Sequence, residues 1–317
     1  VPLDPERVKK VRREEMDFPA GLGDSGVWEY RTIEQCYQDT GRAPLGVRWV
    51  DTDKGDPSRP DYRSRLAVQE TRVRSTIAAD DVGAVFAATP PLECVRILCS
   101  TVMSSDPAEG RVLRFLDISR AHPHCRITRT VYIKLPEEDP RSQEEGICGV
   151  LVMALYGARD AGQNFELTTT EVLEEGGCEQ SAFNPCIYKR EEKQVRFFHH
   201  GDDFVIDGPR NGPEWVAQHL GARFVVKDGG VLGPEPQDLK EVSILNRLIR
   251  WKDRWTPGGE ALEYEADPRH VEILLAQLGA GREDCKPMST PGAQIKITPE
   301  VEVELDAQQA SDRWPPW

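Results

Sequence analysis

The feature that most constrains the fold is the alternation of apolar strands and helices in the middle third of the chain. RVLRFLDI (111–118) predicts a strand ending in Asp117, and DAGQNFELTTTEVLEEGG (160–177) predicts a helix that its glycines close. CIYKR and VRFFHH, followed by FVIDG, predict a hairpin. Pro213 then opens the short helix PEWVAQHLG, and ARFVVKD (222–228) predicts a last strand.

This order of strand, helix, hairpin, helix and strand is the split β-α-β arrangement of ferredoxin-like domains. Many unrelated proteins share it, so the order alone does not identify a function. It predicts an α+β fold in which the first strand and the hairpin lie in one sheet.

Carboxylates stand where that first strand ends and where the hairpin turns. The hairpin is joined through Gly201, Asp202 and Asp203. Because adjacent antiparallel strands bring their ends close together, we expect Asp117 to lie beside this tip. Three close carboxylates repel one another and raise their own pKa values, so a divalent cation is their natural partner. Taken alone, Gly-Asp-Asp is also the composition of an ordinary tight turn.

Length and composition limit the class of protein. The 317 residues leave room for about two domains and a real core. The longest apolar stretch, ICGVLVMALYGA (147–158), is too short to span a bilayer. The charged start of the chain, VPLDPERVKKVRREEMDF, lacks the apolar core of a secretory signal. We therefore expect an intracellular protein without membrane spans, in the cytoplasm or the nucleus.

The charge balance and the cysteines exclude two further classes of site. A formal net charge of −14 argues against a general nucleic-acid binder, so any such site must be local. The basic residues that could form it are Arg42, Arg48, Lys54, Arg59, Arg63, Arg65, Arg72 and Arg74. The eight cysteines form no C-x-x-C pair and have no histidine at zinc-ligand spacing, which predicts reduced and mostly buried thiols.

The remaining segments organise the chain around this centre. Gly, Pro and Asp clusters predict loops at 51–61, 136–146, 229–238 and 256–260. A buried helix is expected to start at Thr89, with Pro90 in its first turn. DPRHVEILLAQLG (267–279) predicts the last helix, with Asp267 as its cap and Gly279 as its stop, and the chain after Pro291 is polar and acidic.

An ordered series of motifs between about 46 and 292 resembles the reverse-transcriptase region of copia-type retrotransposon polyproteins. The series is specific as a set, although each member is weak alone. Its members are RWVDTDKGD (48–56), YRSRLAVQE (62–70), FAATPPLECVRIL (86–98), LRFLDISRA (113–121), VYIKLPEED (131–139), ALYGARDAGQNF (154–165), HHGDDFVIDG (199–208) and MSTPG (288–292).

The resemblance implies an α+β right-hand polymerase with a ferredoxin-like palm, fingers and a partial thumb. It implies an RNA template, a DNA primer and deoxynucleoside triphosphates as partners, and Mg²⁺ as the cofactor. The expected parts of the chain are an N-terminal extension (1–45), fingers (46–109), a palm with the catalytic carboxylates (110–240), a thumb-like region (241–290) and an acidic, disordered tail (291–317).

The resemblance also assigns site residues. It implies that Asp117, Asp202 and Asp203 bind magnesium, although His200 and Gly201 stand where the family usually has Tyr-Val or a close variant. The further residues expected at the nucleotide are Arg63 and Arg65 at the triphosphate, Lys227 near the departing pyrophosphate, and Tyr156 and Gly157 against the nucleotide and template. A solvated basic strand is the alternative for the two arginines.

His122 is the main departure from the family pattern. The fifth residue after the first aspartate is normally an aromatic ring that blocks a ribose 2′-hydroxyl, and here it is a histidine followed by Pro123. We expect His122 beside the sugar position, with packing in a displaced loop as the alternative. His122, the WPPW ending and the lack of an integrase or ribonuclease H region favour a truncated or decaying copy.

Three hypotheses follow from the sequence. The first is an RNA-directed DNA polymerase domain that extends a primer with Mg²⁺. The second is a catalytically silent polymerase-like fold that binds nucleic acid or nothing. The third is an acidic interaction protein, unrelated to polymerases, in which Gly-Asp-Asp is only a turn.

Overall fold

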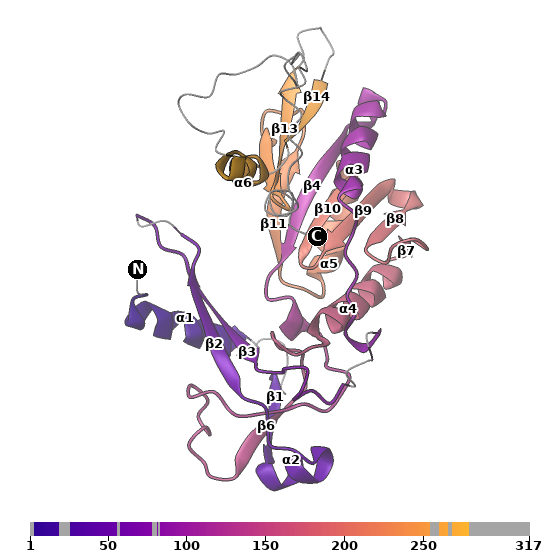
Figure 1. The fold of residues 1–317 in the computed structure, drawn as a ribbon. Coiled ribbons are helices and arrows are strands. Elements are labelled where there is room, and N and C mark those ends of the chain that lie inside the picture. Colours follow the sequence, from indigo (N-terminus) through magenta and orange to yellow (C-terminus); the bar gives the residue numbers. More distant parts are fainter. Residues whose placement is uncertain are drawn as a thin grey trace, which may run out of the picture. The chain divides into compact units, whose positions relative to one another are not determined.

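A computed structural model describes residues 3–18, 26–55, 58–77, 81, 83–253, 260–265 and 268–278 (Figure 1). The chain divides into two compact units, Val1–Glu265 and Ala266–Trp317. In the second unit the described residues form one helix, α6 (Pro268–Leu278). Pro268 stands at its start as predicted, whereas the expected cap, the stop and the acidic tail lie outside the described residues.

The first unit mixes helices and sheets, which confirms an α+β fold. Its helices are α1 (Pro5–Asp17), α2 (Ile33–Thr40), α3 (Glu93–Ser104), α4 (Ala161–Glu175) and α5 (Asn211–Gly221), with short 3-10 helices η2 (Gly83–Val85), η3 (Pro107–Glu109), η4 (His122–His124) and η5 (Glu191–Lys193). Its strands are β1 (Trp28–Thr32), β2 (Val47–Asp53), β3 (Tyr62–Val68), β4 (Arg111–Ile118), β5 (Tyr132–Ile133), β6 (Ile147–Leu151), β7 (Glu179–Gln180), β8 (Ile187–Arg190), β9 (Val195–His200), β10 (Asp203–Pro209), β11 (Val226–Leu232), β12 (Glu241–Ile244), β13 (Arg247–Asp253) and β14 (Glu260–Glu265).

A six-stranded antiparallel sheet in the order β11-β4-β10-β9-β8-β7 forms the centre of the unit. In chain order its core elements are β4, α4, the β9–β10 hairpin, α5 and β11. The predicted succession of strand, helix, hairpin, helix and strand is therefore confirmed, and the first and last strands of the succession are neighbours in the sheet. This topology brings the end of β4 next to the tip of the hairpin.

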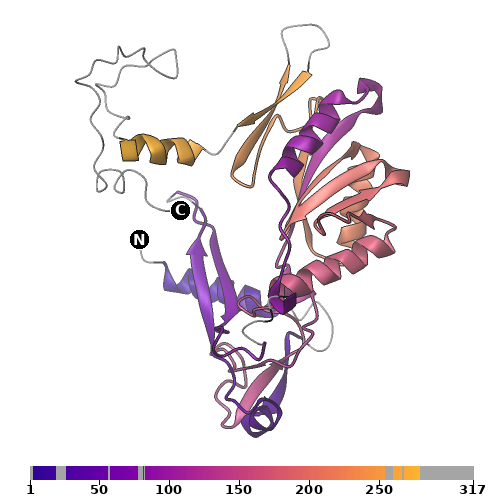
Figure 2. The same ribbon diagram turned by 45° about the vertical axis from the view of Figure 1, so that its right-hand side comes forward.

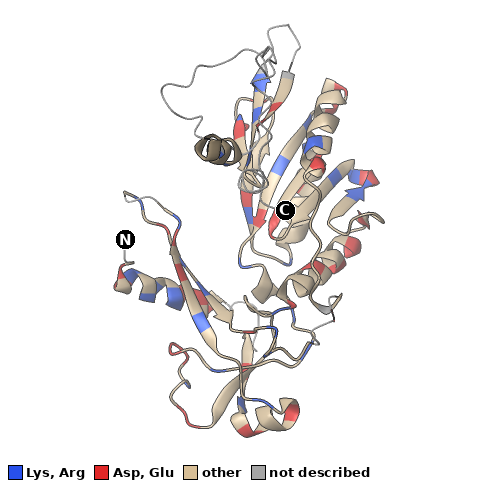
Figure 3. Cartoon of the chain, viewed as in Figure 1, with Lys and Arg blue, Asp and Glu red and all other residues tan. Residues whose placement is uncertain are grey.

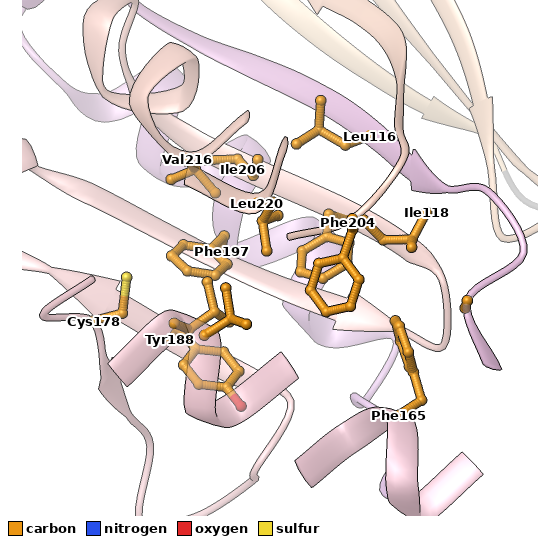
Figure 4. Packing of buried hydrophobic residues seen from close by; sticks show 14 of the residues in the cluster. Leu116, Ile118, Phe165, Cys178, Tyr188, Phe197, Phe204, Ile206, Val216 and Leu220 are labelled. Atoms are coloured by element: carbon orange, nitrogen blue, oxygen red, sulfur yellow. The ribbon is translucent and has the colours of Figure 1, made fainter. Parts of the chain in front are cut away.

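Each face of this sheet buries its own apolar cluster, because successive strand residues point to opposite faces. On one face α4 and α5 cover a cluster that includes Leu116, Ile118, Phe204 and Ile206 (Figure 4). On the other face Leu113, Phe115 and Val205 pack with α3 and with Ile249 and Trp251 of the β12-β13-β14 sheet. Figure 2 shows the ribbon of α3 beside the central sheet. The strands at the centre are fixed from both sides.

Two smaller sheets are formed by strands from before α3 together with two strands that follow β4. β2 pairs with β3 in a hairpin, and β1, β6 and β5 form a three-stranded sheet. Leu66 and Val68 of β3 share one apolar cluster with Leu151 of β6. Helix α1, which the sequence did not predict, packs on β3. Asp4 caps this helix by accepting hydrogen bonds from the backbone N–H groups of Glu6 (3.0 Å) and Arg7 (3.4 Å).

Two helix boundaries differ from their predictions. The buried helix begins at Glu93 and not at Thr89, because each residue before the tandem Pro90-Pro91 is disfavoured in helical conformation. The helix is nevertheless buried as predicted, since Val95, Leu98 and Val102, among others, are buried. Helix α5 begins at Asn211, two residues before the proline that was expected to open it.

The last strand of the central sheet is displaced from its predicted position. It begins at Val226, because Ala222 and Phe224 continue the hydrogen bonding of α5 through N–H groups that reach Gln218 and Leu220. It continues through Gly229–Leu232, part of the predicted loop 229–238, where the pairing with β4 shifts register in a bulge. A Cβ at Gly229 would lie 3.0 Å from the carbonyl oxygen of Phe115, so a larger residue here would require the backbone to shift by a few tenths of an ångström.

The other loop predictions are mixed. Residues 136–146 form turns as expected, whereas 51–53 belong to β2. Of the predicted loop 256–260, only Glu260 is described, and it begins β14. Seven of the cysteines lie in the described residues and all seven are free and buried, as predicted; Cys285 lies outside them. None of the described helices is long and apolar enough to cross a membrane.

Candidate active site

Three candidate residues lie side by side across the central sheet. In the strand register Asp117 of β4 faces Asp203 of β10 on one side and Lys227 of β11 on the other. Directly opposed residues of neighbouring strands project from the same face. The register therefore brings two carboxylates and an ammonium group to one face of the sheet, at one end of strands β10, β4 and β11. This end of the strands is called the carboxylate edge below.

The hairpin turn adds a third carboxylate at this edge. His200 pairs with Asp203, so Gly201 and Asp202 form a two-residue turn. Gly201 has φ +60, the sign that a type II′ turn requires at its first position. The backbone N–H of Ile118 donates a hydrogen bond to the Asp202 carbonyl oxygen (2.9 Å), which fastens the turn to the end of β4.

A cavity of about 240 Å³ opens at this edge. Its lining comes from α1, β3, the end of β4, the turn and β11, and consists of Val11, Glu14, Glu15, Tyr62, Arg63, Ser64, Arg65, Asp117, Ile118, Ser119, Arg120, Tyr156, Asp202 and Lys227. Six of the nine site residues selected from the sequence are in this lining. The three that are not are Asp203, His122 and Gly157.

The carboxylates affect one another electrostatically. Burial, together with the charges of Asp202 and Asp117, raises the pKa of Asp203 to about 6. His200 and Lys54 oppose this rise with their positive charge. Asp203 thus shares its surroundings with two other acids and has no ion-pair partner among the described residues.

The donor set fits a hard divalent cation in its chemistry, since carboxylate oxygens are the ligands that Mg²⁺ prefers. The raised pKa of Asp203 indicates negative charge that a cation would neutralise. The side chains are not arranged as a finished metal site, however. Among the described residues, no three His, Cys, Asp or Glu side chains are placed to hold a metal ion together.

The two candidate arginines of β3 lie on its exposed face. Arg63 pairs with Asp61 (3.1 Å), and both side chains are about half exposed. Arg65 lies over the ring of Tyr156 at 5.1 Å and forms no hydrogen bond or ion pair within the part of the chain that the structure describes. Ser64, between them, points to the other face and donates to Asp51 (2.7 Å). Both arginines thus face the cavity from one strand.

His122 lies behind the cavity wall. Its ring meets Tyr156 edge-on, with the centroids 4.8 Å apart, and approaches Phe165 at 6.5 Å. Burial lowers its pKa, and the nearby Asp202 opposes that change. Its buried Nδ1 has no hydrogen-bond partner among the described atoms. His122 is therefore close to the carboxylates while its ring contacts are those of a packed side chain.

Gly157 has a structural reason to be glycine. Its φ is +80, and a Cβ there would lie 2.2 Å from the carbonyl oxygen of Val68. The N–H of Val68 donates to the carbonyl of Tyr156 (2.7 Å), so strand β3 is joined to this segment. Burial raises the pKa of the Tyr156 hydroxyl to about 12. This close contact places the strand with the two arginines beside Tyr156.

Sequence reasoning missed one side of the cavity. Val11, Glu14 and Glu15 of α1 line it, as does Arg120, which follows the end of β4. No sequence motif identified α1, because it has no buried residue. Figure 3 shows that both charge signs occur on α1 and on the β2–β3 hairpin, whereas the charged residues of α4 are all acidic.

Comparison with known proteins decides the family. Residues 30–233, more than half of the chain, match the family described as reverse transcriptase (RNA-dependent DNA polymerase). The chain belongs to the reverse transcriptase family. No curated protein matches the chain. The resemblance to the reverse transcriptases of copia-type elements is confirmed, because this family occurs in them.

The matched region contains every site residue that the sequence analysis selected, from Arg63 to Lys227. The match ends at Gly233, so it does not include residues 234–292, where the sequence analysis placed the last motif of the series, MSTPG (288–292). Membership in this family overturns the hypothesis of an acidic protein unrelated to polymerases. The family implies nucleic-acid and nucleotide substrates and normally uses divalent metal ions.

Proposed function

We propose that the chain is an RNA-directed DNA polymerase domain that adds deoxynucleotides to a primer on an RNA template. One observation supports this most strongly: the register sets Asp117 between Asp203 and Lys227, and Asp117 and Lys227 line one cavity with Arg63 and Arg65. Phosphoryl transfer requires this combination, because acids must hold cations while basic groups hold phosphate.

The proposed right-hand architecture follows from the same elements. The central sheet with α4 and α5 corresponds to the palm (110–240), and the β2–β3 hairpin and α3 belong to the fingers (46–109). We assign 241–290 to the thumb-like region; its described part includes the three-stranded sheet β12-β13-β14 and α6. Residues 1–45, with α1 and α2, form the N-terminal extension.

In the proposed mechanism Asp117 and Asp202 are the main metal ligands and Asp203 assists them. Bound Mg²⁺ would stabilise the attacking and leaving oxygens of the transfer. Asp203, whose pKa is about 6, is mostly ionised at neutral pH and supplies negative charge beside the other two acids. The backbone hydrogen bond from Ile118 to Asp202 keeps the turn next to β4.

The basic residues would bind the nucleotide. Arg63 and Arg65 project from one face of β3 toward the cavity and are placed to contact the triphosphate. Lys227, beside Asp117, would meet the departing pyrophosphate. Tyr156 is held by Gly157 against β3 and would lie near the base or the sugar, and His122 packs on it from behind.

A catalytically silent polymerase-like fold is the second candidate, and the surroundings of His122 favour it. A blocking ring at this position must reach the sugar, whereas the His122 ring packs against Tyr156 and Phe165.

Primer extension on an RNA template separates the two candidates. We expect Mg²⁺-dependent extension by the native chain and a loss of about 100- to 1000-fold in Asp202→Asn, the size seen when one charge-stabilising group is removed. Asp228→Asn is the matched control, since that carboxylate lies in β11 outside the cavity and pairs with Arg114 (2.8 Å). Equal extension by the native chain and Asp202→Asn would refute the assigned site, and no extension by the native chain would favour the silent fold.

A further inference from the structure

Arg120 is a strained residue at the edge of the proposed site. Its φ is +52, in the left-handed region that side chains other than glycine rarely adopt. It lines the cavity together with Asp117, Asp202 and the two arginines of β3. Non-glycine residues keep such a conformation where the surrounding contacts hold them, and they concentrate at functional sites.

The end of α1 holds the Arg120 side chain. Its guanidinium lies over the ring of Phe18, 4.4 Å from the centroid, and its Nε donates a hydrogen bond to the carboxylate of Glu15. The Glu15 side chain is 11% exposed, so this carboxylate is largely withdrawn from water although it lines the cavity. The Glu15 carboxylate thus occupies the position at which the Arg120 guanidinium could bind another anion.

Helix α1 is firmly attached where it supplies this group. Arg12 forms two hydrogen bonds to the carboxylate of Asp51 (3.1 and 2.6 Å) and stacks over Trp49 at 5.3 Å. Glu14 and Glu15 follow Val11 by three and four residues, so the three residues share one face of the helix, which points at the cavity. The position of Glu15 therefore follows from the docking of the whole helix on the β2–β3 hairpin.

We propose that Arg120 binds the phosphates of the incoming nucleotide and that Glu15 competes with them for its guanidinium. The ligand class is a linear polyphosphate, whose oxygens match the guanidinium as a carboxylate does. In the empty cavity Glu15 neutralises Arg120; a triphosphate displaces it and adds Arg120 to the basic residues of β3. The identity of this ligand rests on the proposed polymerase function.

The test is the affinity for inorganic tripolyphosphate, measured by isothermal titration calorimetry at low ionic strength in one Mg²⁺-containing buffer. Glu15→Gln removes the competing charge and keeps the size of the side chain. We expect it to bind about 10-fold more tightly than the native chain, the effect of one charge-assisted contact of about 1.4 kcal/mol. Glu15→Asp keeps the charge and should bind like the native chain.

Glu14→Gln is the matched control, because Glu14 lines the same cavity but its ion pair is with Lys10 (3.8 Å). It should change the affinity by less than about 2-fold, as expected for an exposed charge. Arg120→Gln should weaken binding about 10-fold and should abolish the effect of Glu15→Gln in the double variant. Equal effects of Glu15→Gln and Glu14→Gln on the affinity would overturn the inference. Additive effects of Glu15→Gln and Arg120→Gln in the double variant would overturn it as well.

Nucleotide incorporation separates this inference from the polymerase proposal. If the native chain extends a primer while Glu15→Gln changes neither the KM for nucleotide nor the affinity for tripolyphosphate, the competition is refuted and the polymerase proposal stands. If tripolyphosphate binding responds to Glu15 as expected while no variant extends a primer, the anion site stands and the polymerase proposal fails. Thermal melting of each variant, followed by circular dichroism, verifies that it is folded.

Discussion

The two ends of the β4–β10 pair bury carboxylates in opposite ways. At one end Asp207, fully buried, accepts hydrogen bonds from Arg111 at 3.1 and 2.6 Å. At the other end Asp203 faces Asp117, another acid. Burial raises the pKa of both Asp207 and Asp203, but Arg111 opposes the rise at Asp207, whereas Asp202 and Asp117 add to it at Asp203.

We infer from this difference that the Asp207 end serves the fold and that the Asp203 end serves the proposed function. A protein that must bury a carboxylate for structure supplies a cation from its own chain, as Arg111 does. Where acids accumulate without such a partner, the fold carries an electrostatic cost, and perturbed groups of this kind concentrate at functional sites. The comparison predicts that Asp207 matters for stability, and that Asp117 and Asp203 matter for binding a cation.

The largest expected effect is at the paired end. Arg111→Met leaves Asp207 buried without its cation and should lower the free energy of unfolding by about 3 to 5 kcal/mol, measured by urea denaturation. Arg31→Met is the control, since Arg31 and Glu29 are both about half exposed, and it should cost less than about 1 kcal/mol. Similar losses of unfolding free energy in Arg111→Met and Arg31→Met would show that the buried Arg111–Asp207 pair contributes no more to stability than an exposed pair.

The next effect concerns His199, a neutral group buried beside the carboxylate end. Burial lowers its pKa to about 4, and its ring stacks on Phe204 at 5.2 Å. The unfolded chain takes up this proton near pH 6.5, so the stability is complete above pH 6.5 and is lost as the pH falls toward about 4.

The expected loss from His199 is about 3 kcal/mol across that window. His122 and His124, whose pKa values burial also lowers, add to the acid loss in the native chain. The contribution of His199 is therefore the difference between the native chain and His199→Phe in urea denaturation at pH 7 and pH 4. Equal acid losses in the two proteins would show that His199 is not held neutral.

A smaller effect is expected at the hairpin tip. Gly201→Ala introduces a Cβ into open space but at φ +60, so it should cost about 1 to 2 kcal/mol of conformational strain without a clash. Gly221→Ala, which also adds a Cβ into open space and lies at the end of α5 without a positive φ, should not destabilise the protein. Thermal melting of the two variants measures the difference, and identical midpoints would contradict the assigned turn.

The smallest expected change in stability is at Asp203. Its raised pKa means that its charge opposes folding above about pH 6, so Asp203→Asn should stabilise the protein slightly at pH 8 and not at pH 4. Solvent screening limits the gain to about 1 kcal/mol or less, because Asp203 is only partly buried. Asp207→Asn should instead destabilise the protein at pH 8, because it leaves the buried guanidinium of Arg111 without its carboxylate partner. Destabilisation by Asp203→Asn at pH 8 would mean that this end, too, is structurally paired.

The sequence predicted the carboxylate edge because local signals and global fold agree there. The apolar strand before Asp117 and the Gly-Asp-Asp turn each have a pattern that depends only on nearby residues. Once the succession of elements is known, antiparallel pairing brings these segments together. The register across β10, β4 and β11 follows from that topology.

The α1 side of the cavity could not be predicted in this way. Most residues of this helix are polar or charged, and its apolar residues, such as Val11 and Met16, are only partly buried, so its apolar face gives a weak signal in the sequence. The positive φ of Arg120 has no sequence signal, because glycine is the residue that usually marks this conformation. The late start of β11 depends on how α5 ends, which is a tertiary effect that the propensity of ARFVVKD does not contain.

The measurement that tests the central claim most directly is the melting temperature of the chain as a function of Mg²⁺ concentration. A ligand that binds only the folded state stabilises it by mass action, by about 2.7 kcal/mol at 100 times its Kd. The melting temperature of the native chain should rise with Mg²⁺, that of Asp207→Asn should rise equally from a lower start, and that of the double variant Asp117→Asn and Asp202→Asn should stay constant. An equal rise in the native chain and the double variant, or no rise in either, would contradict the claim that this end of the sheet is a cation site.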